Sequence, residues 1–362
     1  MGNDCSKCQH KIEEKNTLDL RSVDASAAAE AEKTKLPDLH STEVQELVPE
    51  IIKLQAYFRG RMDRTALLMA DLDLDYSLSE VKDVNHKPSN SFRVGTDLFK
   101  PSNEVRDLMK TLKPFKFDEK SGTKENLPLG GPYAFGEDLY FGQFKYKQRH
   151  GRGKQIFKNG GYYIGWWQND KANGFGRYIH PELDVYEGFW KNDSAEGKGT
   201  YYHRNGAQFY GDWKEDKQDG FGREEWKDGT VYEGQYSDGV KHGHGKFTWI
   251  DGSSYEGEFS QNMIAGYGTY RWADGKIYTG QWQNNKMNGK GVLESPDGKR
   301  YDGNYLNDQK HGFGEFTWPD GKKYVGEWAM GKQHGTGVVW TKEGVKRTGE
   351  FQEGKLVKWL NK

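Results

Sequence analysis

The chain has 362 residues, a net charge of −1, 34% hydrophobic residues, 14% aromatic residues and 47 glycines. The near-neutral charge argues against nucleic acid as a partner. No run of about 18 apolar residues is present to span a membrane. The low apolar content argues against one thick core, yet the aromatic residues are too many for a disordered chain. We therefore expect a thin structure whose buried layer consists of aromatic rings.

Residues 1–40 are polar and of low complexity, which predicts a disordered tail. They begin with MGNDCSKC, which fits the pattern M-G-x-x-x-[ST] for N-myristoylation of Gly2. One myristoyl chain binds membranes with an association constant of only roughly 10⁴ M⁻¹, so stable anchoring needs a second signal. The tail has six Lys and Arg against eight Asp and Glu and therefore lacks a polybasic patch.

The two cysteines of the chain, Cys5 and Cys8, are the remaining candidates for that second signal, as palmitoylation sites. No apolar signal-peptide core follows Met1, so the chain is expected in the reducing cytosol, where a disulfide is disfavoured. The alternative interpretation is that the Met-Gly start is accidental and the tail carries no lipid.

Residues 41–70 contain the stretch IIKLQAYFRGRMDR, which predicts a helix that begins near Pro49. Its apolar residues recur at spacings of three and four, and residues 51–70 carry four cations and one anion. The stretch resembles the IQ motif, [ILV]-Q-x3-R-G-x3-[RK]. This resemblance implies binding of calmodulin or another EF-hand protein through Leu54, Gln55, Phe58, Arg59, Gly60 and Arg64. The alternative is a helix that docks on the chain's own repeats.

Residues 71–139 are predicted to be an irregular linker with short elements. One short helix is expected in SNEVRDLMKTL, with Ser102 as its N-cap.

From Tyr140 onward the sequence repeats every 23 residues, as in YTGQWQNNKMNGKGVLESPDGKR from Tyr278. Nine copies follow one another without a gap, and a tenth begins at Arg347 and lacks the later glycines. A fixed period of this size predicts a solenoid-like array. Residues are numbered below by their position in the copy, with Tyr140, Tyr163 and each corresponding residue at position 1.

Each copy is predicted to be a β-hairpin. Positions 1, 3 and 5 are aromatic, Gly and aromatic, as in Tyr278, Gly280 and Trp282, so they share one face of a strand. Positions 12 and 14 are both Gly in all nine copies, and position 16 adds an apolar or aromatic residue in a second strand. An Asp-Gly or Asn-Gly pair closes most copies and takes the positive φ of a tight turn at little cost. In the second copy HPELDV replaces this pair, which predicts a distorted turn.

Glycine inside the strands leaves space for a ring to lie over the backbone. Rows of glycine beside rows of rings then give offset or edge-to-face aromatic contacts along one face. The expected fold class is all-β, an elongated single-layer antiparallel sheet of stacked hairpins, preceded by an α-helix and a disordered tail. The array is expected over residues 140–362.

The combination Y-x-G-x-W, G-x-G and D-G resembles the MORN repeat family. The resemblance implies twisted, single-layer antiparallel hairpins and a scaffolding role, often at membranes, junctions, basal bodies or ciliary axonemes. It implies a face lined by the aromatic residues of positions 1 and 5: Tyr163, Trp167, Tyr186, Trp190, Phe209, Trp213, Tyr232, Tyr255, Phe259, Tyr278, Trp282, Tyr301, Tyr324 and Trp328.

No catalytic constellation is recognised, and neither a cofactor nor a metal is expected. Four histidines occupy position 11 of their copies and are spread along the array rather than clustered as metal ligands must be. The G-x-G pairs lack the third glycine and the following helix of a phosphate-binding loop.

Two functions remain. The first is a non-enzymatic scaffold, lipid-anchored to the cytoplasmic face of a membrane such as the ciliary or plasma membrane, with an EF-hand partner and a protein client on the repeats. The second is a structural subunit of a ciliary axoneme, like a radial-spoke protein, or of another cytoskeletal assembly, without a membrane anchor.

Overall fold

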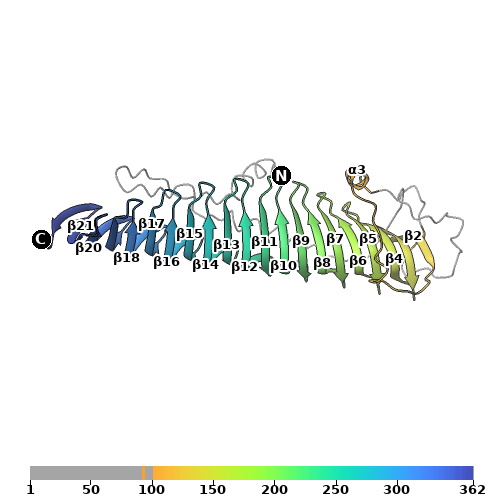
Figure 1. Cartoon of the computed structure of the whole chain (residues 1–362). Helices are drawn as coiled ribbons and strands as arrows, with labels where there is room; N and C mark the ends of the chain where they lie inside the picture. The colour runs from red at the N-terminus through yellow and green to blue at the C-terminus, as the bar shows by residue number, and fades with distance from the viewer. Residues whose placement is uncertain (1–91, 94–100, 362) are drawn as a thin grey trace, which may run out of the picture. The chain divides into compact units, whose positions relative to one another are not determined.

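The computed structural model describes residues 92–93 and 101–361, so the predicted acylation sites and the IQ-like helix lie outside the described residues. The described part is one open antiparallel sheet of 21 consecutive strands with one short helix before it, which confirms the predicted fold class. The chain divides into two compact units. Of the described residues, the N-terminal unit contains 92–93, 101–227 and 235–240, and the C-terminal unit contains 228–234 and 241–361. Within each unit, consecutive strands lie side by side (Figure 1).

The N-terminal unit opens with the two-residue strand β1 (Phe92–Arg93), which pairs with β2, and helix α3 (Asn103–Thr111). As predicted, Ser102 is the N-cap of α3, and its side chain accepts a hydrogen bond of 3.2 Å from the backbone of Val105. The strands of this unit are β2 (Leu129–Phe135), β3 (Asp138–Lys145), β4 (Gln148–Ile156), β5 (Tyr162–Gln168), β6 (Lys171–Ile179), β7 (Val185–Lys191), β8 (Ser194–Tyr202), β9 (Gln208–Lys214) and β10 (Lys217–Glu225).

Strand β11 (Val231–Ser237) contains residues of both units. The strands of the C-terminal unit are β12 (Val240–Thr248), β13 (Ser254–Ser260), β14 (Met263–Arg271), β15 (Ile277–Gln283), β16 (Lys286–Glu294), β17 (Arg300–Leu306), β18 (Gln309–Thr317), β19 (Lys323–Ala329), β20 (Lys332–Trp340), β21 (Lys346–Gln352) and β22 (Lys355–Trp359). The incomplete tenth copy therefore still forms a hairpin, β21–β22.

Glycines of positions 3 and 14 face one another across the strands and form a row. In the seventh copy, Gly280 pairs with Gly291, which in turn pairs with Gly303 of the next copy. The ring of Tyr278 lies over this row, because a Cβ added at Gly291 would overlap the phenol atoms of Tyr278. The prediction that glycine leaves space for a ring is confirmed.

The rings interlock edge to face along the sheet. Tyr278 meets Trp282 of its own copy at a centroid distance of 5.1 Å and 89°, and Tyr305 of the next copy at 5.1 Å and 84°. Its hydroxyl donates a hydrogen bond of 3.0 Å to the carbonyl of Gln281. Each tyrosine thus joins its own hairpin to the following one, as expected for a repeat array stabilised by nearest-neighbour interfaces.

The tight turn of each hairpin lies at positions 7 and 8, which the sequence analysis did not single out. Asn284 and Asn285 have φ of 50° and 63°, as a type I′ turn requires. As predicted, the Asp-Gly pairs that close the copies form the turns that link one copy to the next, and only their glycines have positive φ, as at Gly275 with 86°. Asp274 of that pair accepts a hydrogen bond of 3.1 Å from the backbone of Lys276, which is an Asx turn.

Position 8 also joins neighbouring copies. The backbone N–H of Asp308 donates to the carbonyl of Met287 at 3.0 Å, and the carboxylate of Asp308 accepts from the N–H of Met287 at 2.7 Å. Asn285 makes the same pair of bonds with Ile264. A short Asn or Asp side chain therefore both tolerates positive φ and bonds to the preceding copy.

The prediction of a distorted turn in the second copy is wrong. Leu183 occupies the glycine position with φ of 74° and donates to the carbonyl of His180 at 2.9 Å, as Gly275 does to Trp272 in the sixth copy. The side chain of Leu183 packs against the apolar cluster that contains Val105 of α3. This packing accounts for a leucine where the other copies use glycine.

Candidate protein-interaction surface

The two faces of the sheet differ in exposure. Side chains at positions 1, 5, 10 and 16 point to one side, here called the ring face. All the aromatic residues predicted for this face are at most 5% exposed, so they form the core. Side chains at positions 2, 4, 13 and 15 point to the other side, here called the outer face. The rings are therefore buried, and the accessible side chains of these strand positions lie on the outer face.

The chain covers part of its own outer face in the N-terminal unit. Val105 of α3 is fully buried in a cluster with Phe141, Ile164 and Ile179, which stand on the outer face of the first two copies. A pocket of about 270 Å³ lies between the end of α3 and β5–β6 and is lined by Met109, Phe115 and Arg177, among others.

Residues 115–121 continue this cover beyond the helix. Phe115 stacks on Phe175 of position 13, with ring centroids 5.8 Å apart and planes at 12°. Phe117 meets Trp166 of position 4 edge to face at 5.6 Å, and the carboxylate of Glu119 forms an ion pair of 2.8 Å with Arg152 of position 13. The indole of Trp166 donates to the carbonyl of Asp118 at 2.9 Å.

Position 13 lies at a β-bulge, since positions 11 to 13 of one strand face a single residue of its partner. At the bulge, the backbone N–H of position 13 donates a hydrogen bond to the side chain at position 4 instead of to a backbone carbonyl of the paired strand. Gln281 accepts from the N–H of Lys290 at 2.7 Å, and Glu258 accepts from the N–H of Tyr267 at 2.9 Å. In the second copy position 4 is Trp166, which has no acceptor, and the hydroxyl of Ser121 takes its place by accepting from Phe175 N–H at 2.9 Å.

Side chains at position 13 alternate between basic and aromatic along each unit. The N-terminal unit has Arg152, Phe175, Lys198 and Phe221, and the C-terminal unit has His244, Tyr267, Lys290 and Phe313, after which Thr336 of the ninth copy ends the alternation. Tyr267 and Phe313 are 56% and 61% exposed.

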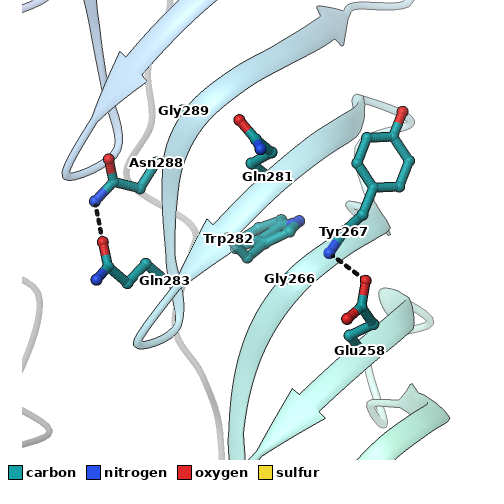
Figure 2. Close-up of a pocket in the computed structure, with 8 residues that line it drawn as sticks. All are labelled: Glu258, Gly266, Tyr267, Gln281, Trp282, Gln283, Asn288 and Gly289. Atoms are coloured by element: carbon teal, nitrogen blue, oxygen red, sulfur yellow. Dashed lines mark hydrogen bonds between the residues drawn. The ribbon is translucent and has the colours of Figure 1, made fainter.

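An open recess of about 410 Å³ lies in the C-terminal unit beside this line of side chains. Figure 2 shows Tyr267 on one side of it and Gln283 and Asn288 on the other, with Gln281 and Trp282 between them. Asn288 donates to Gln283 at 2.9 Å, and Glu258 is bonded to the backbone of Tyr267. The recess is lined by the amide side chains of Gln281, Gln283 and Asn288 and by Glu258 and Tyr267.

The residues predicted for lipidation (Gly2, Cys5, Cys8) and for calmodulin binding (Leu54, Gln55, Phe58, Arg59, Gly60, Arg64) lie outside the described residues. In the part that the structure describes, no three His, Cys, Asp or Glu side chains are placed to hold a metal ion. None of its helices is both long and apolar enough to cross a bilayer.

Two buried ionisable groups stand out on the ring side of the eighth copy. Burial raises the pKa of Asp308 to about 6, although its hydrogen bond from Met287 and the nearby cation of Lys286 act in the opposite direction. Burial lowers the pKa of Lys310 to about 8. The ammonium of Lys310 lies 4.8 Å from the ring centroid of Phe316 and 5.2 Å from that of Trp328, which favours the cation.

Asp308→Asn is expected to stabilise the protein at pH 7 by about 1–2 kcal/mol. The pKa of Asp308 is higher in the folded protein than in the unfolded chain. The protein therefore loses stability as the pH rises from the unfolded pKa near 4 to the folded pKa of about 6, because the folded state must then release a proton that it holds tightly. One carboxylate oxygen of Asp308 is buried and has no hydrogen-bond partner in the part of the chain that the structure describes, whereas Asn285 shows that an amide fits this position. Urea unfolding at pH 4, 5, 6 and 7 measures the effect.

The matched control is Asp297→Asn, in an exposed loop where a hydrogen bond and the Lys299 cation lower the pKa of the carboxyl. This variant should gain nothing at pH 7. Equal pH dependence of wild type and Asp308→Asn between pH 4 and 6 would show that Asp308 is not protonated in that range.

Three solved structures illustrate what the chain resembles. The wild-type TCP10 domain of Danio rerio CPAP is 15% identical, over 57% of this chain and 98% of that chain, with a TM-score of 0.33. The SAS-4 (dCPAP) TCP domain of Drosophila melanogaster, in complex with a proline-rich motif of Ana2 (dSTIL), is 19% identical over 43% and 85%, with a TM-score of 0.28. Virginiamycin B lyase from Staphylococcus aureus is 10% identical over 64% and 87%, with a TM-score of 0.13. Likeness at this level says nothing about function.

No curated protein is significantly similar to the chain. The family comparison is specific, because the MORN repeat model matches residues 140–162, 163–184, 186–208, 209–231, 232–254, 255–277, 278–300, 301–323 and 324–344. These matches begin at the same residues as the nine copies read from the sequence. They describe a family of repeat scaffolds, and no catalytic family is indicated. With its interlocked tyrosines, its glycine rows and these nine matches, the chain belongs to the MORN repeat family.

Proposed function

We propose that this MORN repeat protein is a non-enzymatic scaffold, held at the cytoplasmic face of a membrane by acyl chains, that binds calmodulin or a related EF-hand protein and a protein client. The observation that supports the scaffold is the use that the chain makes of its own outer face. Residues 115–121 lie across it and are held by a ring stack, an ion pair and hydrogen bonds to an indole and a backbone N–H. A surface that binds one extended segment in this way is suited to bind others.

The anchor and the EF-hand partner are supported by sequence alone. Gly2 has the context for myristoylation, and Cys5 and Cys8 supply the second signal that stable attachment needs. The IQ-like helix follows the tail in the sequence, so its partner would be held close to the membrane.

The second candidate function is a structural subunit of a ciliary axoneme or another cytoskeletal assembly, without an anchor. Here Gly2 and the cysteines carry no lipid. Intact mass of the native protein, combined with metabolic labelling by myristate and palmitate analogues, separates the two candidates. Mass increments for one myristoyl and at least one palmitoyl group support the first function, and an unmodified chain supports the second.

Replacing Leu54 and Phe58 together by alanine should weaken calmodulin binding more than replacing either Arg59 or Arg64. The leucine and phenylalanine supply the apolar area that an EF-hand groove buries, whereas an exposed arginine adds attraction that salt screens. Calorimetric titration of calmodulin into the full chain, with calcium and with chelator, measures both effects. The loss in the double variant should persist at high salt, and the loss in each arginine variant should shrink.

No heat of binding in either condition, for the unmodified chain, would contradict calmodulin binding. The interpretation of residues 41–70 would then be a helix that docks on its own repeats.

A further inference from the structure

We propose that the outer face of the sixth to eighth copies binds an extended segment of a partner protein in which one acidic residue lies between two aromatic residues. The binding residues are Tyr267, Lys290 and Phe313, here called the position-13 row. The inference rests on the proposed scaffold function and names the chemistry of the client.

The chain shows this recognition within its own N-terminal unit. There position 13 presents Arg152 and then Phe175, the same basic and aromatic pair. Residues 115–121 meet the pair with matching groups, because Phe115 stacks on Phe175 and Glu119 forms an ion pair with Arg152. The guanidinium of Arg152 also lies 5.4 Å from the ring centroid of Phe117. An aromatic and acidic segment is therefore the chemistry that these positions bind.

The position-13 row of the C-terminal unit has the same kinds of side chain, basic and aromatic, and these side chains are exposed. Tyr267 and Phe313 are more than half exposed, and Lys290 is exposed and has no ion pair among the described residues. Nearby charges at positions 2 and 15 are already matched, since Glu315 pairs with Lys323 at 2.7 Å and Asp302 with Arg300 at 2.8 Å. Lys290 is thus a free cation between two exposed rings.

Spacing defines the segment that fits. Neighbouring strands lie about 4.8 Å apart, so position 13 recurs every second strand, at about 10 Å. In the chain's own segment, the step from Phe175 to Arg152 is covered by four residues, from Phe115 to Glu119. An even spacing also keeps both side chains on the same face of an extended segment. The segment therefore has the pattern aromatic-x-x-x-acidic-x-x-x-aromatic and crosses the strands, held by side chains. The recess beside Tyr267 and Gln281 has room for one of its aromatic side chains.

The test uses the full chain and a fluorescein-labelled peptide, Ser-Phe-Thr-Thr-Thr-Glu-Thr-Thr-Thr-Phe-Ser, and binding is followed by fluorescence anisotropy. Saturable binding is expected, and the same peptide with Lys in place of Glu should bind at least about tenfold more weakly. Lys290→Glu should weaken binding of the first peptide by a similar factor and strengthen binding of the second. Such a reversal of the preference between the two peptides would show that the acidic residue of the peptide binds at Lys290.

The double variant Tyr267→Ala with Phe313→Ala should also weaken binding of the first peptide by about tenfold or more. Two control variants, Ile250→Ala and Lys342→Glu, change exposed loop positions of the same unit and should leave binding of this peptide unchanged. Unfolding midpoints verify that the variants fold, as expected for exposed side chains. The inference is overturned if the first peptide fails to saturate below about 1 mM, or if Lys290→Glu leaves the preference between the two peptides unchanged. Neither outcome affects the acylation experiment, so the proposed anchor and this inference fail separately.

Discussion

Full-length protein carrying Gly2→Ala is expected to lose its membrane-bound fraction almost completely. The myristoyl group is attached to the amine of an N-terminal glycine, and alanine at this place does not fit the pattern. Stable anchoring needs a second lipid signal beside the myristoyl chain, so loss of the first signal should release the protein. Fractionation of cells into membrane and soluble pools, with acyl labelling of each, measures the loss.

Two further variants separate the signals. Cys5→Ser with Cys8→Ser should keep the myristoyl group and leave a weak attachment that washes off, because one chain binds with an association constant of only roughly 10⁴ M⁻¹. Asn3→Ala, at a position that the pattern leaves free, should behave as wild type. If the Gly2→Ala protein sediments with membranes as wild type does, the proposed anchor is wrong and the cytoskeletal function becomes the better candidate.

Gly257→Val is expected to lower the free energy of unfolding by about 3 kcal/mol, the upper end of the range for overpacking. A Cβ at Gly257 would lie 2.5 Å from the Cα of Gly268, 2.5 Å from the hydroxyl oxygen of Tyr255 and 2.7 Å from the carbonyl oxygen of Tyr267. Two of these neighbours are backbone atoms that cannot rotate away. Relief would require β13 and β14 to separate or the Tyr255 ring to leave its contacts with Phe259 and Trp282.

Urea unfolding and hydrogen exchange of β13–β16 measure this effect, since the damage in a repeat array should be greatest near the altered interface. Glu256→Val is the matched control, because it places the same side chain one residue away on the outer face and removes only an exposed ion pair of 3.6 Å with Lys246. It should change the unfolding free energy by about 1 kcal/mol or less. Equal midpoints for Gly257→Val and wild type would contradict the packing of rings over glycine.

Much of the fold follows from sequence because its interactions are local. A 23-residue copy contains the ring of Tyr278, the glycines beneath it and the partner ring of Trp282, so the pattern of one copy predicts the strands, their faces and their packing on the next copy. The cap of α3 at Ser102 is local as well. The tight turn at positions 7 and 8 was not predicted from the sequence. An Asp-Gly pair and an Asn-Asn pair are both turn signals, and only the backbone angles show that Asn284 and Asn285 form the tight hairpin turn.

What the repeat pattern could not reveal is the side of the sheet that remains open to a partner. Residues 115–121 contact Arg152, Trp166 and Phe175, which lie roughly 30 to 60 residues later in the chain, and no periodicity links such distant groups. The same is true of Leu183, which occupies a turn position of positive φ and packs against the cluster around Val105. Sequence by itself therefore determined the repeat, its strands and its buried rings. Only the tertiary structure decided that the rings are closed off and that the outer face is where the chain binds its own segment, because those contacts depend on residues that meet only after folding.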